Sequence, residues 1–189
     1  MTSDSNTPSR IAAQRPRRSV AVFSCVALVG LIIDRASKLL ALRYLSLDES
    51  KRVIPHLLSL RLLRNPGASL GFGSNSTWVI SLLAIAACIA LVILAFRSTS
   101  RLWVIVLGMA FAGAAGNLID RVVYADGMLN GKVVDFLDYG WSVGNVADIF
   151  LMLAGICMVV LVCVGVPWRI SDQDADNHHG SADTHDSNE

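Results

Sequence analysis

Four long apolar stretches dominate the pattern of hydrophobic and polar positions along the chain. They are residues 20–42, 78–96, 102–119 and 143–166. A bilayer core about 30 Å thick is crossed by roughly 20 helical residues, each of which advances the chain by about 1.5 Å. Since every stretch meets or approaches this length, the pattern predicts four transmembrane helices that run alternately up and down through a membrane.

The connection between the first two stretches shows a different period. Residues 45–77 are too many for a simple turn, and within them Leu58, Leu60 and Leu62 alternate with polar residues. Alternation with a period of two is typical of a strand that is buried on one face. The sequence therefore predicts a small β-sheet on the membrane surface, attached to an otherwise all-α integral membrane protein.

Both ends of the chain are polar. Arginines gather before the first stretch, and the segment after Ile170 is rich in Asp, His, Ser and Asn, a composition that cannot bury enough apolar surface to form a core. The sequence thus divides into a cytoplasmic N-terminal segment, 1–18, a four-helix membrane domain, 19–169, and an acidic C-terminal tail, 170–189, that we expect to be disordered. We interpret the histidines of this tail as solvated residues and not as metal ligands.

Basic residues ahead of an apolar stretch can also mark a cleavable secretory signal. No small-residue cleavage site follows Ile33, where Asp34 and Arg35 stand instead, so we expect the first helix to be retained. Lysines and arginines near the span ends are equally numerous on the two sides of the membrane. Those on the N-terminal side are packed into short flanks, which favours cytoplasmic N- and C-termini.

The composition agrees with a membrane protein. Hydrophobic residues make up 53% of the chain and charged residues 16%, against roughly 25% charged residues in soluble domains. The formal net charge is +1, and no broad basic face indicates nucleic-acid binding. The cysteines all lie in apolar stretches without metal-ligand spacing, so we interpret them as small buried hydrophobic residues and expect no disulfides.

Ionisable residues interrupt three of the apolar stretches and carry the functional argument. Asp34 lies in the first stretch, Asp120 follows the third, and Asp148 lies near the start of the fourth, so up-and-down alternation brings all three toward one membrane face. A charged group inside a bilayer costs at least a few kcal/mol, and such residues usually face the bundle interior. Lys38 stands four residues after Asp34, the favourable order for an ion pair, so we interpret this pair as structural support of a site.

Two further sets of polar residues have helical spacing. Asn117 lies three residues before Asp120 and four before Arg121, and Asn145 lies three residues before Asp148. Residues three or four apart share one face of a helix, so each set forms a polar stripe. The two stripes can face each other from neighbouring helices.

Asp135 adds another acid as the chain returns toward the fourth stretch, so it can approach Asp148 at the membrane surface. Two carboxylates in a shielded site do not both ionise cheaply, and one keeps its proton. The ionised member can then take a proton from water, while the protonated member hydrogen-bonds a carbonyl oxygen under attack. Arg121 or Lys38 can hold neighbouring acids ionised and leave this pair to share its proton.

Five sequence blocks resemble, in order, the signature blocks of the lipoprotein signal peptidases, also called signal peptidase II. The blocks are IIDRASK at 32–38, RNPGA at 64–68, GAAGNLIDR at 113–121, VVDF at 133–136 and NVAD at 145–148. Five blocks in the family's order are hard to match by chance. The chain departs from the common pattern in a short stretch between Asp135 and Asp148, and in Gly144, which stands where an aromatic residue often precedes the asparagine.

The resemblance implies a membrane aspartic endopeptidase, without metal or other cofactor, whose catalytic dyad is Asp135 and Asp148. The implied reaction is cleavage of prolipoprotein signal peptides just before a diacylglyceryl-modified cysteine, at the outer face of the bacterial cytoplasmic membrane. The implied fold is four transmembrane helices with a small extracytoplasmic β-cradle, and we expect a monomer. The positions that shape the site or hold substrate in the family match Asp34, Lys38, Asn65, Gly116, Asn117, Asp120, Arg121 and Asn145.

Three other functions fit the sequence less well. Residues 67–71 match the G-x-S-x-G pattern of serine hydrolases, but that motif needs a strand, a turn and a helix in a soluble α/β sheet, and this serine precedes a membrane helix. A transporter or proton relay also places acids in the membrane, yet the two halves of the chain share no evident repeat. A divalent metal held by carboxylates lacks any motif of spaced ligands in the apolar stretches.

Overall fold

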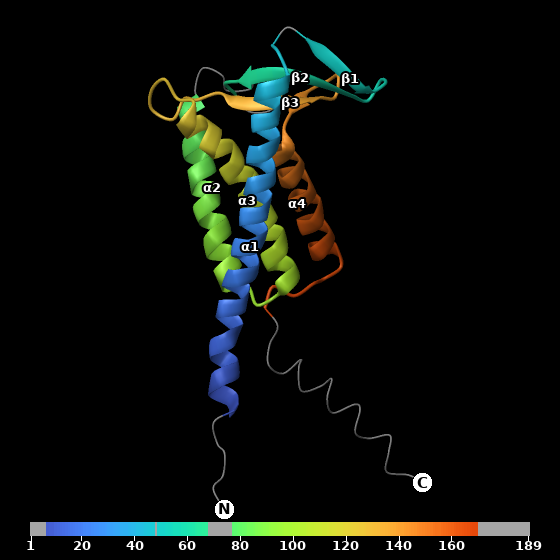
Figure 1. Ribbon diagram of the computed structural model, residues 1–189. Coiled ribbons are helices and arrows are strands. Elements are labelled where there is room, and N and C mark those ends of the chain that lie inside the picture. The colour runs from blue at the N-terminus through green and yellow to red at the C-terminus, as the bar shows by residue number, and fades with distance from the viewer. Residues whose placement is uncertain (1–6, 48, 68–76, 170–189) are drawn as a thin grey trace, which may run out of the picture.

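The structure is a computed structural model that describes residues 7–47, 49–67 and 77–169, with 7–18 described by their backbone alone. Four helices form a bundle (Figure 1). They are α1 Thr7–Tyr44, α2 Thr77–Arg97, α3 Arg101–Val123 and α4 Val146–Cys163. Each is long and apolar enough to cross a membrane, and in α1 the part that qualifies is Ser19–Tyr44. The prediction of four transmembrane helices is confirmed. The C-terminal tail with its histidines and the serine of the 67–71 motif lie outside the described residues.

The helices expose large apolar side chains on their outer surfaces. Leu28 on α1, Leu83 on α2 and Val159 on α4 are all exposed, whereas Asp34 and Asp120 are fully buried. A soluble helical bundle would have the opposite arrangement, because water favours charged side chains at its surface. The distribution is the one expected for a bundle whose outer surface contacts lipid.

Helix α3 is the most enclosed of the four helices and packs against the other three. Small residues permit these close approaches. A Cβ atom added at Gly113 would lie 2.5 Å from the Ala147 carbonyl oxygen of α4, and one added at Gly30 of α1 would lie 2.6 Å from the Ala112 Cβ. Such distances leave no room for a methyl group, so α1 and α4 both meet α3 almost backbone to backbone.

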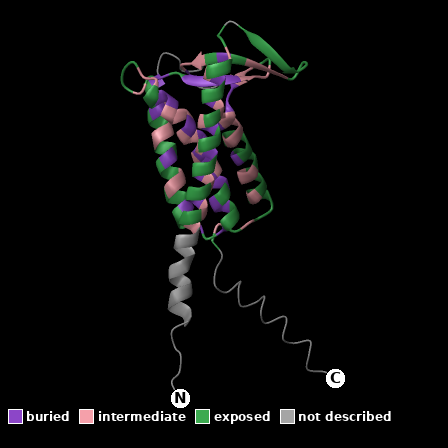
Figure 2. Ribbon diagram, in the orientation of Figure 1, coloured by how far each residue is buried: buried purple, intermediate pink, exposed green. Residues whose placement is uncertain are grey.

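A four-stranded antiparallel sheet lies across the end of the bundle where α1 ends and α4 begins (Figure 1). Its order is β1 Ser50–Ile54, β2 Leu58–Asn65, β3 Val133–Asp138 and β4 Val143–Gly144. The predicted surface sheet is therefore confirmed, and β2 contains the alternating leucines. Figure 2 shows buried positions on β3, where the sheet meets the helices, and on the inner faces of the bundle.

The fourth apolar stretch does not form one helix from residue 143, as the sequence predicts. Val143 and Gly144 form β4, which pairs with β3, and α4 begins only at Val146 because Asn145 caps it. Val143 and Gly144 are as apolar as Val146 and Ala147 at the start of the helix, so hydropathy does not separate strand from helix. The third helix also runs past its predicted end at 119, to Val123, which places Asp120 and Arg121 within the helix.

Candidate active site

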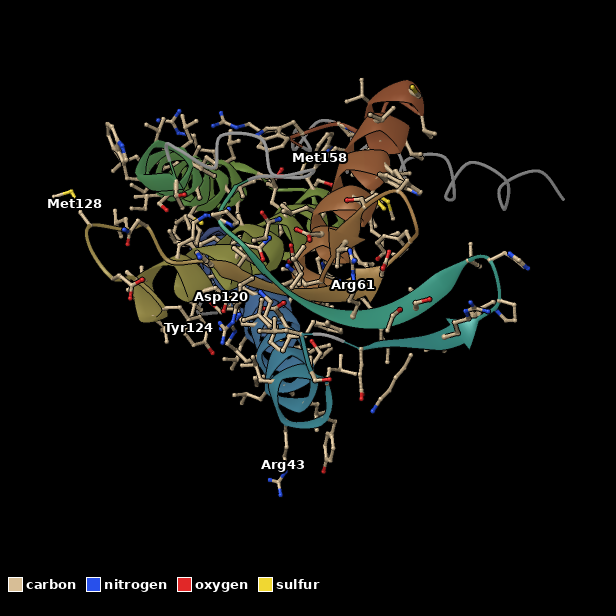
Figure 3. All side chains as sticks on the ribbon, turned by 90° about the horizontal axis from the view of Figure 1, so that it is seen from above. Arg43, Arg61, Asp120, Tyr124, Met128 and Met158 are labelled. Atoms are coloured by element: carbon tan, nitrogen blue, oxygen red, sulfur yellow. The ribbon has the colours of Figure 1, made fainter. Side chains whose placement is uncertain are left out.

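Polar side chains from four elements meet where the sheet lies on the bundle. Asn65 ends β2, Asp135 lies in β3, Asn117 lies in α3, and Asn145 and Asp148 stand at the start of α4. Figure 3 looks down onto this end of the molecule and shows Asp120 amid the helices, while Arg43 and Met128 lie at the periphery. The sheet thus brings together residues that are far apart in the sequence.

Asp135 is buried and held by two amide side chains. Its Oδ2 accepts a hydrogen bond from Asn65 Nδ2 at 2.8 Å, and its Oδ1 accepts one from Asn145 Nδ2 at 2.6 Å. Burial raises the pKa of Asp135 to about 6, and the negative charge of Asp148 acts in the same direction. The two amide hydrogen bonds and the charge of Lys38 oppose this rise. Asp135 therefore keeps its proton to a higher pH than an ordinary aspartic acid does.

Asp148 belongs to a capping box at the start of α4. Its Oδ2 accepts the Asn145 backbone N–H at 3.0 Å, and its own backbone N–H donates to Asn145 Oδ1 at 3.2 Å. Its Oδ1 accepts a third hydrogen bond, from Asn117 Nδ2 at 2.8 Å. The N-terminus of a helix favours negative charge, and these donors stabilise a carboxylate.

Asn145 connects the two carboxylates. Its fully buried side chain donates to Asp135, accepts from the Asp148 backbone, and also donates to Asn117 Oδ1 at 3.0 Å. Each polar atom of the Asn145 side chain therefore has a partner. Substitution of this residue would remove contacts to both acids at once.

Beneath the pair lies a four-charge cluster, formed by Asp34, Arg35, Lys38 and Asp120. Arg35 contacts Asp34 at 2.9 Å and Asp120 at 2.6 Å. Lys38 contacts Asp34 at 3.1 Å and Asp120 at 2.8 Å, so the ion pair expected from the four-residue spacing is present. Two positive and two negative charges cancel, which lowers the cost of placing them in the bundle interior.

The sequence analysis did not single out Arg35 as a site residue. Neighbouring positions on a helix point in different directions, so spacing predicted no contact with Asp34. The long guanidinium side chain nevertheless turns back to Asp34 and reaches across to α3. Two signals were available: its position beside an acid in an apolar helix, and its place within the IIDRASK block at 32–38.

Arg121 and Gly116 complete the surroundings. Arg121 forms no ion pair within the part of the chain that the structure describes, and instead donates to the carbonyl oxygens of Gly67 at 2.8 Å and Asn117 at 3.4 Å. Lys38, rather than Arg121, pairs directly with buried acids. At Gly116, an added Cβ atom would lie 2.7 Å from Asp34 Oδ2, so only glycine leaves room for that carboxylate.

The chemistry open to this arrangement is proton exchange between two carboxylates. Asp34 and Asp120 are paired with cations, whereas among the described residues Asp135 and Asp148 receive their hydrogen bonds from amide side chains and a backbone N–H group. Within the described residues, no group of three or more His, Cys, Asp and Glu side chains is placed to hold a metal ion. Asp135 and Asp148 can therefore act as an acid and a base toward water and a substrate carbonyl.

These features define a multi-span membrane protein with a linked carboxylate pair where its bundle meets a surface sheet. A family model described as Signal peptidase (SPase) II matches residues 26–164. The chain belongs to the signal peptidase II family and is a multi-pass protein of the bacterial inner membrane.

Individual relatives and solved structures agree with this assignment. A lipoprotein signal peptidase of Bifidobacterium adolescentis is 60% identical over 164 residues, which cover 87% of this chain and 88% of the relative. One from Rhodococcus jostii is 36% identical and covers 84% of this chain and 82% of its own. Two solved structures, described as bacterial membrane enzymes, are similar with TM-scores of 0.67 and 0.64 at 29% and 26% identity. They cover 76% of this chain and 88% and 93% of their own chains.

Proposed function

We propose that the protein is a membrane aspartic endopeptidase that removes signal peptides from prolipoproteins by cleaving just before a diacylglyceryl-modified cysteine. The observation that carries the proposal is the pair of carboxylates, Asp135 and Asp148, linked through Asn145 at the junction of the bundle and the sheet. Relatives named lipoprotein signal peptidases support the substrate class. The activity needs no metal or other cofactor, because the two acids supply the proton transfers.

The proposed mechanism uses one ionised and one protonated carboxylate. Asp148, whose charge is stabilised at the start of α4, takes a proton from a water molecule, and the oxygen of that water attacks the scissile carbonyl carbon. Asp135 donates its proton toward the carbonyl oxygen as negative charge develops there. The tetrahedral intermediate then collapses: the C–N bond breaks, Asp148 gives its proton to the leaving amine, and a hydroxyl of the intermediate returns a proton to Asp135 as the carboxylic acid product forms. No covalent bond to the enzyme forms.

The placement of the site suits a substrate held in the membrane. The pair lies at the end of the bundle opposite the start of α1 (Figure 1). With cytoplasmic termini, this end faces the outer side of the inner membrane, where a cysteine carrying a diacylglyceryl group is anchored in the outer leaflet. We propose that the enzyme works as a monomer.

The decisive experiment is cleavage of a defined substrate by purified protein in detergent. One substrate is a diacylglyceryl-modified prolipoprotein, and the other is the same polypeptide without the lipid. Mass spectrometry of the products should show cleavage before the modified cysteine and none in the unmodified polypeptide. Equal cleavage of both substrates would contradict the lipid requirement, and failure of the folded protein to cleave either one would contradict the peptidase assignment.

The pH dependence of this activity should reflect the raised pKa of Asp135. Because the folded protein holds this proton up to about pH 6, the acid form declines above that value, and kcat/KM should fall about tenfold per pH unit. Bound substrate excludes further water and raises the pKa again, so the fall in kcat should begin at higher pH than the fall in kcat/KM. Because Asp135 and Asp148 interact, the pKa values obtained from the two profiles belong to the pair and not to either residue alone. Flat profiles between about pH 5 and 8 would contradict a protonated Asp135.

A further inference from the structure

We propose that Asp34 and Asp120 are positioning residues, which fix the separation of Asp135 and Asp148 by holding the backbone N–H group that immediately precedes each of them. This inference rests on the proposed peptidase function. It assigns the two cation-paired acids a part in setting catalytic geometry that goes beyond support of the fold.

The contacts are parallel in the two halves of the site. Asp34 Oδ1 accepts the backbone N–H of Ala147 at 3.1 Å, and Ala147 directly precedes Asp148. Asp120 Oδ2 accepts the backbone N–H of Val134 at 3.2 Å, and Val134 directly precedes Asp135. Both accepting carboxylates are fully buried, as are the Ala147 and Val134 residues that they hold.

Each contact fills a gap in the local hydrogen bonding. The first backbone N–H groups of a helix have no hydrogen-bond partner within that helix. At the start of α4, the Asn145 side chain accepts the N–H of Asp148. The N–H of Ala147 donates instead to the Asp34 carboxylate of α1. Strand β4 pairs with β3 only at Leu137 and Asp138, near the end of β3. Nearer the start of β3, the Asp120 carboxylate accepts the backbone N–H of Val134.

Arg35 and Lys38 make the two contacts interdependent. Each cation touches both Asp34 and Asp120, so neither carboxylate can move without breaking an ion pair in the bundle interior. Loss of one partner from such a pair leaves an uncompensated buried charge, which is strongly unfavourable. The four-charge cluster therefore ties a point on α4 to a point on β3, and these two points carry the proposed dyad.

Gly116 gives independent support for this arrangement. Its carbonyl oxygen accepts a hydrogen bond from Arg35 Nη2 at 3.0 Å, and the space of its absent side chain is occupied by the Asp34 carboxylate. The added Cβ would also lie 3.3 Å from the Ala147 Cβ. Asp34 is thus packed into one position, directly beside the start of α4.

The test uses Asp34→Asn and Asp120→Asn in the full-length protein in detergent. Asparagine keeps the shape, but its NH2 group cannot accept a hydrogen bond, so the side chain can no longer serve both cations and the backbone N–H group together. We expect kcat to fall about 10²-fold, since a displacement of about 1 Å can have that effect. KM should change less than about threefold, because in this proposal the two acids act through the backbone of the dyad and not on substrate. A merely structural role would not produce this split between kcat and KM.

Hydrogen exchange followed by mass spectrometry gives a second readout that does not depend on activity. Asp34→Asn should speed exchange in the peptide that contains Ala147, and Asp120→Asn should speed it in the peptide that contains Val134, each without the other. Gly116→Ala offers a further variant that keeps all four charges and displaces mainly the Asp34 carboxylate, since the added Cβ would lie 2.7 Å from Asp34 Oδ2 and 3.3 Å from the Ala147 Cβ. If Asp34→Asn prevents folding, Gly116→Ala takes its place in the test. It should then show the lower kcat and the faster exchange of the Ala147 peptide that are predicted for Asp34→Asn.

The matched control is Asp138→Asn, which changes another acid of β3 whose ion pair with Arg61 lies at the surface. Its kcat should stay within about twofold of the wild-type value, as expected for a partly exposed pair outside the site. The proposal is overturned if both cluster variants keep wild-type kcat, or if exchange rises evenly along the chain. Wild-type protein and Asp135→Asn are assayed in parallel, so failure of the peptidase assignment is recognised separately, and the exchange measurements decide the positioning role in either case.

Discussion

Replacing Asp135 or Asp148 with asparagine is expected to reduce kcat by about 10²- to 10⁴-fold, the usual contribution of general acid–base catalysis. Asparagine preserves the size of the side chain and removes the proton that the pair shares. Because the two acids act as one unit, the double variant should be no less active than either single variant. The measurement is single-turnover cleavage of a lipid-modified prolipoprotein, with thermal unfolding of each variant recorded alongside.

A suitable control for the dyad is Asp126→Asn. Asp126 is exposed in the connection between α3 and β3, so this variant undergoes the same chemical change outside the site and should cleave at the wild-type rate. Additive losses in the double variant would indicate two independent roles. Normal cleavage by both single variants would rule out the dyad.

The Asn145→Ala variant is expected to lose stability and activity together. Loss of an N-cap side chain costs about 1 kcal/mol, and Asp135 and Asn117 each lose a buried hydrogen-bond donor as well. With the link gone, Asp135 and Asp148 no longer share a fixed geometry, and kcat should fall about 10²-fold. Thermal unfolding and steady-state kinetics on the same preparation measure the two effects.

Ser100 provides a matched control for this substitution. It is the N-cap residue of α3, but its side chain makes no capping hydrogen bond. Ser100→Ala should therefore leave both the unfolding temperature and kcat close to wild type. If Asn145→Ala lowered stability and retained full kcat, Asn145 would be only a helix cap, and the link between the two carboxylates would not matter for catalysis.

The environments of the buried acids separate their roles. Asp34 and Asp120 each contact two cations. Asp135 accepts hydrogen bonds from two amide side chains, and no cation within the described ranges forms an ion pair with it. A carboxyl group in such surroundings can hold and release a proton near neutral pH, as the proposed mechanism requires.

Much of the fold was predictable from the chain. The length of the apolar stretches predicted the helices, and the alternation of Leu58, Leu60 and Leu62 predicted a strand, which the structure has as β2. The start of α4 was not predictable in this way, because Val143 and Gly144 continue the apolar pattern while pairing with β3. A short strand that directly precedes a helix of the same hydropathy can be recognised only from the strand with which it pairs, here β3.

The sequence by itself determined four spans and brought the acids to one membrane face, because span length and strict alternation leave little freedom within a bilayer. Only the tertiary structure decided which acids pair with cations and which remain available for proton transfer. Arg35 and Lys38 reach from α1 to Asp120 on α3, and such contacts between helices have no fixed spacing in the sequence. The partners of Asp34 and Asp120 on α4 and β3 are backbone N–H groups, which every residue except proline carries, so no residue type marks them in advance.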